Sequence, residues 1–375
     1  MSMVEWKKLE DCLDFEQPTP YLVKSTEYDD AYKTPVLTAG QSLLLGYTNE
    51  TSGIYIATKE NPTIIFDDFT TSFHWIDYSF KIKSSAMKML RPKKGINFRF
   101  IYYSMKCIDF IPGGHQRHWI SKYSQFLIPI PSLEEQTRIV GILDTFTSAI
   151  DNLKEQIAQR RKQYEYYRDQ LLDLEGKEII TTLSFGDDFQ LKARIGWQGL
   201  TKKEYKTSGD YKLVTGTDFT GNLRIDFESC VFVEKERYEQ DEYIKLKVGD
   251  VLITKDGTLG KVAYIDKLDM PATLNGGVFV VRDPKERVIP KFIMYYLTSY
   301  HFKKWMQQNH TTGSIQHLTQ KLLSTFTIPV LSEIEQQRIV SILDTFEASI
   351  QNLEAQLDQR QKQYEYYRNK LLTFE

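Results

Sequence analysis

Apolar residues recur at alternating intervals of four and three positions in two separate stretches of the chain. The stretches cover residues 139–174 and 339–374, and a single arginine, Arg160 or Arg360, interrupts each at the same place. This spacing is typical of a long helix that buries a narrow stripe against a partner helix. The residues that we assign to helix pairing are Ile139, Leu143, Phe146, Ile150, Leu153, Arg160, Tyr164, Ile339, Leu343, Phe346, Ile350, Leu353, Arg360 and Tyr364.

The two stretches belong to an internal repeat. Residues 128–172 return as residues 328–372 without a gap, and 28 of the 45 positions are identical. In each copy a serine, Ser132 or Ser332, lies three residues before a glutamate, which is the spacing of a helix-capping box. We therefore expect one helix of about 42 residues in each copy, about 65 Å long at ~1.5 Å per residue.

A helix of this length needs a partner, and the other copy is the simplest one. The interval of 200 residues between the copies leaves room for a domain that returns the chain in the opposite direction. We therefore predict an antiparallel coiled coil. Arg160 and Arg360 would lie in its seam, where a polar residue lowers stability but can fix the register. Contacts to a third chain are the alternative role for these arginines.

Short strands and glycine-containing turns are expected in the two segments outside the long helices, which we call the first and second heads. A helix is expected late in each head, at residues 96–108 and 288–308. The predicted fold class is α+β, with two globular β-rich heads, two long helices and a pseudo-two-fold internal repeat. The expected boundaries are 1–131 for the first head, 132–175 for the central helix, 176–331 for the second head and 332–375 for the C-terminal helix.

Composition favours a folded intracellular protein. The chain is 41% hydrophobic, and its three cysteines are widely spaced with no CxxC pair, which is typical of a reducing compartment. No apolar stretch has the length of a signal region or a membrane span. We therefore expect a cytoplasmic protein without a membrane partner.

Motifs for catalysis are not found in the sequence. The six histidines form no metal-binding pattern, and the segment Asp256 to Lys261 has a GxxGK spacing that differs from a phosphate-binding loop. A hairpin turn is the favoured interpretation of that segment. Asp67 and Asp68 are expected to have turn or hydrogen-bonding roles. We expect no metal site and no cofactor bound by this chain.

Positive charge is concentrated at the end of the first head. Residues 81–122 contain ten lysines and arginines against Asp109 alone, within a chain of net charge −2. A solvated face is the ordinary meaning of such a run, whereas basic and amide side chains on glycine-containing loops favour nucleic-acid contacts. The DNA-binding candidates are Lys88, Arg91, Lys93, Lys94, Gly113, His115, Gln116, Arg117, His118, Thr254, Lys255, Thr258, Lys261, Thr312, Gly313, Ser314, Gln316 and His317.

Two of these loops lie at the same place in the repeat, because Gly113 matches Gly313 and Gln116 matches Gln316 at the offset of 200. The alternative to DNA contact is that the glycines shape a turn and the glutamines tie each head to its helix. Residues that differ between the loops, such as Arg117, are the better candidates for reading different targets.

The repeated block Ile-Pro-x5-Glu-Gln-x2-Ile, at residues 128–139 and 328–339, begins a long helix on either side of a variable domain. Together with GDVLIT and GTLG within residues 249–260, it resembles the specificity (S) subunit of Type I restriction-modification systems. The resemblance implies that each head is a target recognition domain for half of a bipartite double-stranded DNA site. It also implies a non-catalytic chain bound by two modification subunits, which hold S-adenosylmethionine and methylate adenine. Restriction subunits, where present, would use ATP and Mg. The first head departs from this pattern, with PTIIFDDFTTSF at residues 62–73.

Two other functions remain open at this point. A coiled-coil adaptor without DNA specificity would bind proteins through its heads, and its binding would not fall steeply with salt. A nuclease would cut DNA alone in the presence of a divalent metal.

Overall fold

The computed structural model describes residues 4–38, 43–114, 116–194, 199–257, 259–309 and 318–374. The chain divides into two units, one formed by Met1–Asn152 with Leu357–Glu375 and the other by Leu153–Gln356. Each unit therefore combines one head with part of both long helices. None of the described helices is long and apolar enough to cross a membrane.

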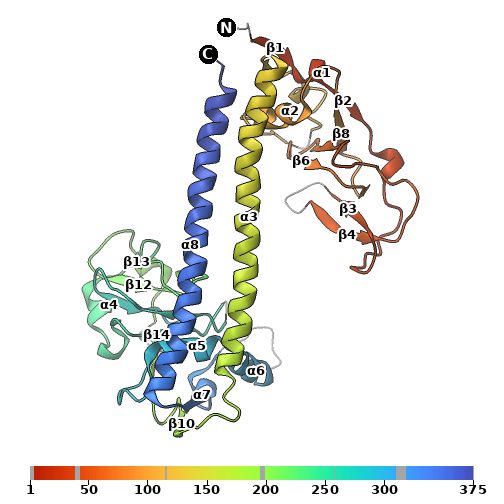
Figure 1. Cartoon of the computed structure of the whole chain (residues 1–375). Coiled ribbons are helices and arrows are strands. Elements are labelled where there is room, and N and C mark those ends of the chain that lie inside the picture. Colours follow the sequence, from red (N-terminus) through yellow and green to blue (C-terminus); the bar gives the residue numbers. More distant parts are fainter. Residues whose placement is uncertain are drawn as a thin grey trace. The chain divides into compact units, whose positions relative to one another are not determined.

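The two long helices are α3 (Leu133–Leu172) and α8 (Glu333–Leu372), each of 40 residues (Figure 1). The backbone amides of Glu135 and Glu335 donate to the hydroxyls of Ser132 and Ser332, both at 3.3 Å, so each serine caps its helix as the spacing predicts. The α+β class and the repeated helices are confirmed.

Contacts within each unit show that α3 and α8 run antiparallel. In the first unit Phe146 of α3 stacks on Tyr367 of α8, with ring centroids 5.3 Å apart. In the second unit Phe346 of α8 stacks on Tyr167 of α3 at 5.5 Å. The start of one helix thus meets the end of the other in both units. The two contacts are equivalent, because Phe146 and Tyr367 of the first unit correspond to Phe346 and Tyr167 of the second.

The seam side chains are buried to different degrees. Ile139, Leu143, Ile339 and Leu343 are fully buried. Ile150 is also buried. The other apolar seam residues are half-buried: Phe146, Leu153, Tyr164, Phe346, Ile350, Leu353 and Tyr364. Arg160 is half-buried, whereas Arg360 is exposed and holds its guanidinium 5.8 Å from the ring centroid of Phe146 on the other helix. This contact fits the role of a register device for Arg360.

The first head contains two sheets, one of four antiparallel strands in the order β2-β8-β5-β6 and one of three strands in the order β4-β3-β7. A separate pair, β1 and β9, joins the N-terminal segment to the strand before α3. The elements are β1 (Glu5–Lys8), α1 (Leu9–Cys12), β2 (Leu13–Glu16), β3 (Thr34–Leu37), β4 (Leu44–Thr48), β5 (Thr63–Asp67), β6 (Phe73–Ile76), β7 (Lys81–Ile82), β8 (Met87–Pro92), α2 (Phe98–Met105) and β9 (Leu127–Ile130), with 3-10 turns at Thr19–Tyr21 and Tyr123–Gln125.

The second head repeats this topology. Its four-stranded sheet has the order β11-β17-β14-β15, its three-stranded sheet the order β13-β12-β16, and β10 pairs with β18 before α8. In both three-stranded sheets one neighbour of the central strand is antiparallel and the other is parallel. The elements are β10 (Thr181–Ser184), β11 (Gln190–Lys192), β12 (Lys212–Val214), β13 (Val231–Phe232), α4 (Lys235–Glu239), β14 (Val251–Thr254), β15 (Val262–Tyr264), β16 (Ala272–Leu274), β17 (Val278–Arg282), α5 (Pro290–Thr298), α6 (Tyr300–Gln308), α7 (Gln320–Leu323) and β18 (Thr327–Val330), with 3-10 turns at Lys202–Glu204 and Glu242–Ile244.

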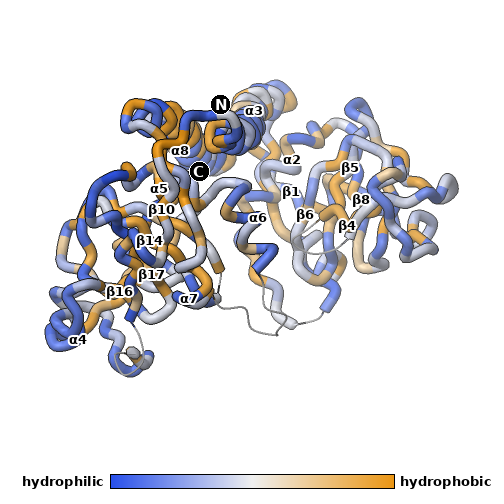
Figure 2. Tube along the Cα trace, turned by 90° about the horizontal axis from the view of Figure 1, so that it is seen from below, coloured by the Kyte–Doolittle hydropathy of each residue, from blue (hydrophilic) through white to orange (hydrophobic). Residues whose placement is uncertain are grey.

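Apolar strands form the interior of each head, as the orange segments of β5, β8, β14 and β17 indicate in Figure 2. Every residue of β5 and β14 is buried. The aligned strands also show that PTIIFDDFTTSF of the first head forms the β5–β6 hairpin, which corresponds to the β14–β15 hairpin of GDVLIT and GTLG.

A buried glutamine ties each head to its long helix. The Oε1 atom of Gln136 accepts from the amide of Asn97, the N-cap of α2, at 3.0 Å. The Oε1 atom of Gln336 accepts from the amide of Ile289, the N-cap of α5, at 2.8 Å. These glutamines belong to the repeated Glu-Gln pair, so the motif holds the helix of each head against the start of α3 or α8.

The structure differs from the sequence-based expectation at one helix and one strand. One helix was expected over residues 288–308, but α5 and α6 are separate because Ser299 adopts an extended conformation with ψ 167. The Ser299 hydroxyl donates to the carbonyl of Tyr296 at 2.7 Å, which stabilises the break. The strand β8 was missed because it lies within the basic run.

Candidate nucleic-acid interface

In the first head, the loop after α2 meets the β5–β6 hairpin turn. The amide of His118 donates to the carbonyl oxygen of Asp68 at 2.9 Å, and the amide of Trp119 donates to Asp68 Oδ1 at 2.7 Å. Asp67 closes the turn itself, because its Oδ1 accepts from the Phe69 amide at 3.0 Å. The expected turn and hydrogen-bonding roles of both aspartates are confirmed.

The second head joins the equivalent segments. The amide of Leu318, which corresponds to His118, donates to the carbonyl of Lys255 in the β14–β15 turn at 3.0 Å. The amide of Lys261 donates to the Thr254 hydroxyl at 2.9 Å across the same turn. The hairpin expected at residues 256–261 is confirmed. In both heads the fold thus brings the loop after the head helix to one hairpin turn.

Exposed candidates are concentrated on the loop of the first head. Gly113, Gln116 and Arg117 are exposed, and the Ser121 hydroxyl donates to the Arg117 carbonyl at 2.8 Å. This hydrogen bond fixes the backbone of Arg117 and leaves its guanidinium at the surface. The loop can therefore offer amide and guanidinium donors to phosphates or base edges.

Two candidates of the first head are not surface groups. The side chain of Lys88 is only 2% exposed, and its Nζ lies 3.1 Å from Asp68 Oδ2, which is equally buried. His118 is buried against Phe110, with ring centroids 5.5 Å apart. The expectation that they face DNA is corrected, because both side chains stabilise the junction between loop and hairpin.

The other basic candidates, within and after β8, differ in exposure. Arg91 is half-buried, and its Nε donates to the Tyr55 hydroxyl at 2.8 Å. The Nζ of Lys93 donates to the carbonyl of Glu10 at 2.7 Å. Lys94 is exposed. Much of the basic run therefore has partners within the head, so its charge of +9 overstates the positive charge available for DNA.

In the second head, Thr254 is buried and is corrected to a structural residue of the hairpin. Lys255 is half-buried, with its Nζ 5.1 Å from the ring centroid of Phe279, and Lys261 is exposed. The candidates that lie outside the described residues are His115, Thr258, Thr312, Gly313, Ser314, Gln316 and His317.

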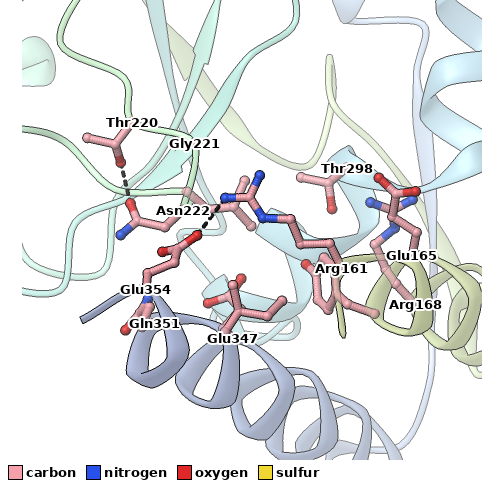
Figure 3. Close-up of a pocket in the computed structure, with 13 residues that line it drawn as sticks. Arg161, Glu165, Arg168, Thr220, Gly221, Asn222, Thr298, Glu347, Gln351 and Glu354 are labelled. Carbon is pink, nitrogen blue, oxygen red and sulfur yellow. Dashed lines mark hydrogen bonds and ion pairs between the residues drawn. The ribbon is translucent and has the colours of Figure 1, made fainter. Parts of the chain in front are cut away.

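A cavity of about 460 Å³ lies in the second unit, between α3, α8 and the segment 220–223 (Figure 3). Its wall includes Glu347, which is 8% exposed, together with Arg161 and Arg168. Burial raises the pKa of the Glu347 carboxyl to about 7, the nearby Arg224 guanidinium lowers it, and the Asp344 carboxylate raises it. Sequence reasoning missed this site, although the repeat carries a signal: Thr147 occupies the position equivalent to Glu347.

The chain matches the family described as the Type I restriction modification DNA specificity domain over residues 1–160 and 197–360. It is also 38% identical to the specificity subunit of a type I restriction enzyme from Escherichia coli, over 99% of this chain and 94% of the relative. The chain belongs to the type I restriction-modification specificity-subunit family. The resemblance carried by the repeated block is therefore confirmed.

The chain is also similar to other specificity subunits over its full length. A putative type I specificity subunit of Haemophilus influenzae is 29% identical over 100% of this chain and 96% of the relative. The S subunit of a type I system from M. genitalium has a TM-score of 0.63 at 16% identity, covering 100% of this chain and 97% of that chain. The fold of this specificity subunit is thus that of a solved S subunit.

No group of three or more His, Cys, Asp or Glu residues in the described ranges is placed to hold a metal ion. The exposed side chains of the described candidates are the amide of Gln116 and the cationic groups of Lys94, Arg117 and Lys261. Such groups can bind and orient a polyanion.

Proposed function

We propose that each head contacts one half of a bipartite sequence in double-stranded DNA and that the paired helices fix the gap between the halves. One observation carries this proposal: two heads of the same topology are fixed to the repeat by the same bonds, while the residues of their loops differ. A shared attachment gives both heads an equivalent place on the scaffold. Different loops allow them to read different bases.

A second tie in each unit supports the equivalent attachment. In the first unit Asp144 of α3 accepts from the Tyr103 hydroxyl and from Arg99 Nε, both on α2. In the second unit Asp344 of α8 accepts from the Tyr295 hydroxyl and from Lys291 Nζ, both at 2.7 Å and both on α5. Each head helix is therefore held at two points, the buried glutamine and this aspartate.

We also infer that two modification subunits bind this chain, because the repeat presents the same surface twice. Tyr166 and Tyr366 are each 59% exposed, and each forms an edge contact with the next tyrosine at 5.3 Å. Exposed aromatic side chains are enriched at protein interfaces. In this proposal the modification subunits supply S-adenosylmethionine and methylate adenine, restriction subunits supply ATP and Mg where they are present, and this chain supplies selection without catalysis.

Binding to DNA duplexes with two randomised blocks and a variable spacer tests the proposal. The chain is mixed with its modification subunits, and bound duplexes are sequenced at several salt concentrations. We expect one two-part sequence with a constant spacer and an affinity that falls steeply with salt. Bound duplexes without a common sequence, or binding insensitive to salt, would favour a protein-binding adaptor instead.

A further inference from the structure

The cavity in the second unit contains a buried acid whose charge is incompletely compensated. Among the described residues, Glu347 Oε1 has no hydrogen-bond partner. The neighbouring Tyr295 hydroxyl donates to Asp344 at 2.7 Å. The Glu347 Oε2 atom lies 3.7 Å from Arg224 Nη2, but Arg224 also lies 3.1 Å from Asp266 through its Nε. One carboxylate oxygen of this cavity-lining residue is therefore buried without a hydrogen-bond donor.

The two arginines of the cavity wall have partners, whereas the acid Glu165 is exposed to solvent. Arg161 of α3 binds Glu354 of α8, as the dashed line in Figure 3 shows. Arg168 lies 3.0 Å from Asp169. Among the described residues of the wall, Glu347 is therefore the buried acid without a close cation, whereas water screens the exposed Glu165. Phosphate groups of DNA are unsuited to this place because a carboxylate repels them.

Comparison with the first unit shows that Glu347 is not needed for the attachment of the head. The cation, aspartate and tyrosine of the tie are present in both units, but the first unit has Thr147 where the second has Glu347. The Thr147 hydroxyl lies 3.2 Å from the Tyr103 hydroxyl, so it completes the local hydrogen bonding. The second unit keeps the tie and adds an acid, at a cost in desolvation that an external cation would offset.

We propose that the Glu347 cavity receives an arginine or lysine side chain of the modification subunit that binds the second unit. This inference rests on the proposed binding of modification subunits. A protein ligand fits because Tyr166 and Tyr167 of α3, 59% and 45% exposed, lie between the lining residues Tyr164 and Arg168 in sequence. A cationic side chain surrounded by aromatic contacts is a common energetic centre of protein interfaces.

The two modification subunits are then held unequally, because Thr147 offers no charge in the first unit. Replacing Glu347 should weaken one of the two binding events and leave the other unchanged. The affinity of that event should also rise with pH, since the entering cation binds the ionised acid. The titratable groups that face Glu347 from the surrounding elements are Tyr164, Arg168, Arg224, Lys291, Tyr295 and Asp344.

Titration of the full chain with the modification subunit, followed by native mass spectrometry, tests this inference. Glu347→Thr copies the first unit, Glu347→Gln removes only the charge, and Glu165→Gln removes an exposed acid from the same cavity as a control. We expect the first two variants to weaken the second binding event at least tenfold, because each removes the charge that the entering cation binds. The control should bind like the wild type.

The wild-type chain should bind its second modification subunit roughly tenfold more tightly at pH 8 than at pH 6, whereas Glu347→Gln should show no such dependence. Equal behaviour of Glu347→Gln and Glu165→Gln would overturn the inference while leaving the proposed function intact. A wild-type chain that binds no modification subunit would contradict the proposed function itself. Circular dichroism of each variant separates lost binding from lost folding, and Glu347→Gln is the closest match in size if Glu347→Thr does not fold.

Discussion

Two buried charges, Lys88 in the first unit and Glu347 in the second, differ in how their charge is compensated. Lys88 has a close partner in Asp68, at 3.1 Å, and this ion pair lies beneath the loop of the first head. Within the described residues, the ion-pair partner of Glu347 is Arg224, at 3.7 Å, which also pairs with Asp266. A buried ion pair with good geometry is a fixed structural element, whereas a buried acid without a close partner titrates near neutral pH.

The stability of the chain alone should therefore depend on Glu347 and pH. The raised pKa of about 7 means that the folded chain holds a proton that the unfolded chain releases near pH 4.5. The contribution to stability is present at low pH and is lost as the pH rises through about 7. Relative to the wild type, Glu347→Gln should gain about 3 kcal/mol of unfolding free energy between pH 5 and pH 8. Urea unfolding at four pH values measures this, and a difference that is constant with pH would exclude titration of Glu347.

Arg117 is the most informative single residue for DNA contact, because it is exposed on the loop that differs between the heads. Arg117→Ala should weaken DNA binding by about 1–3 kcal/mol if the guanidinium contacts a base, and only at the first half-site. Lys59→Ala, which removes an exposed cation from the turn near residues 58–61, is the control. Unchanged affinity, salt slope and half-site preference in Arg117→Ala would show that this loop does not meet DNA.

Charge in the sequence could not separate Arg117 from Lys88. Period-two alternation identifies the solvent face of a strand only when one face is exposed, but the first four residues of β8 are all buried between β2 and β5. The partner of Lys88 lies on a hairpin distant in sequence. The repeat, in contrast, was visible in the sequence because identical residues recur at a fixed offset of 200 positions.

At the scale of elements, the long helices and the head helices are joined through few but buried polar groups. The Gln336 side chain is 1% exposed, and besides its bond to Ile289 its Nε2 donates to the Leu331 carbonyl at 2.9 Å. The shared Glu-Gln motif is visible in the sequence. Its role is visible only in the structure, because the contact of Gln336 with the start of α5 depends on where α5 lies. The break between α5 and α6 could likewise not be predicted from the sequence, because the apolar pattern continues across Ser299.

Replacement of Gln336 tests this junction. Gln336→Ala leaves the amide of Ile289 without its acceptor and should destabilise the second unit by about 1–3 kcal/mol. Gln337→Ala, which changes an exposed neighbour, should have little effect. Hydrogen exchange of α5 provides the local readout. Equal protection of α5 in the two variants would contradict the role of Gln336 as a tie.

The length of α3 provides a second test at this scale. Four residues inserted between Gln156 and Ile157 lengthen the helix by about 6 Å. We expect unchanged half-sites and a gap longer by one or two base pairs in the sequence that is methylated. The same insertion between Glu175 and Gly176, after the end of α3, is the control and should leave the gap unchanged. Altered half-sites with an unaltered gap would contradict the role of the helices as a ruler.

At the scale of the whole molecule, the chain contains two heads of the same topology, each followed by a long helix, with loops that differ in sequence. Both heads have the same strand order, and both are preceded by a strand that pairs with the one leading into a long helix. Duplication was evident from the sequence for the helices, where 28 of 45 positions are identical. The duplication could not be detected from the sequences of the sheets. Their strand order is the same in both heads although the residues differ, because a fold tolerates substitutions that keep the buried strands apolar.

Mapping of methylated adenines tests the central claim most directly. Unmethylated genomic DNA is treated with the chain, its modification subunits and S-adenosylmethionine, and every modified position is located by sequencing. We predict methylation within one two-part sequence whose halves are separated by an unread gap of constant length. Methylation within a continuous sequence, or at sites without a common sequence, would contradict the assignment of one half-site to each head.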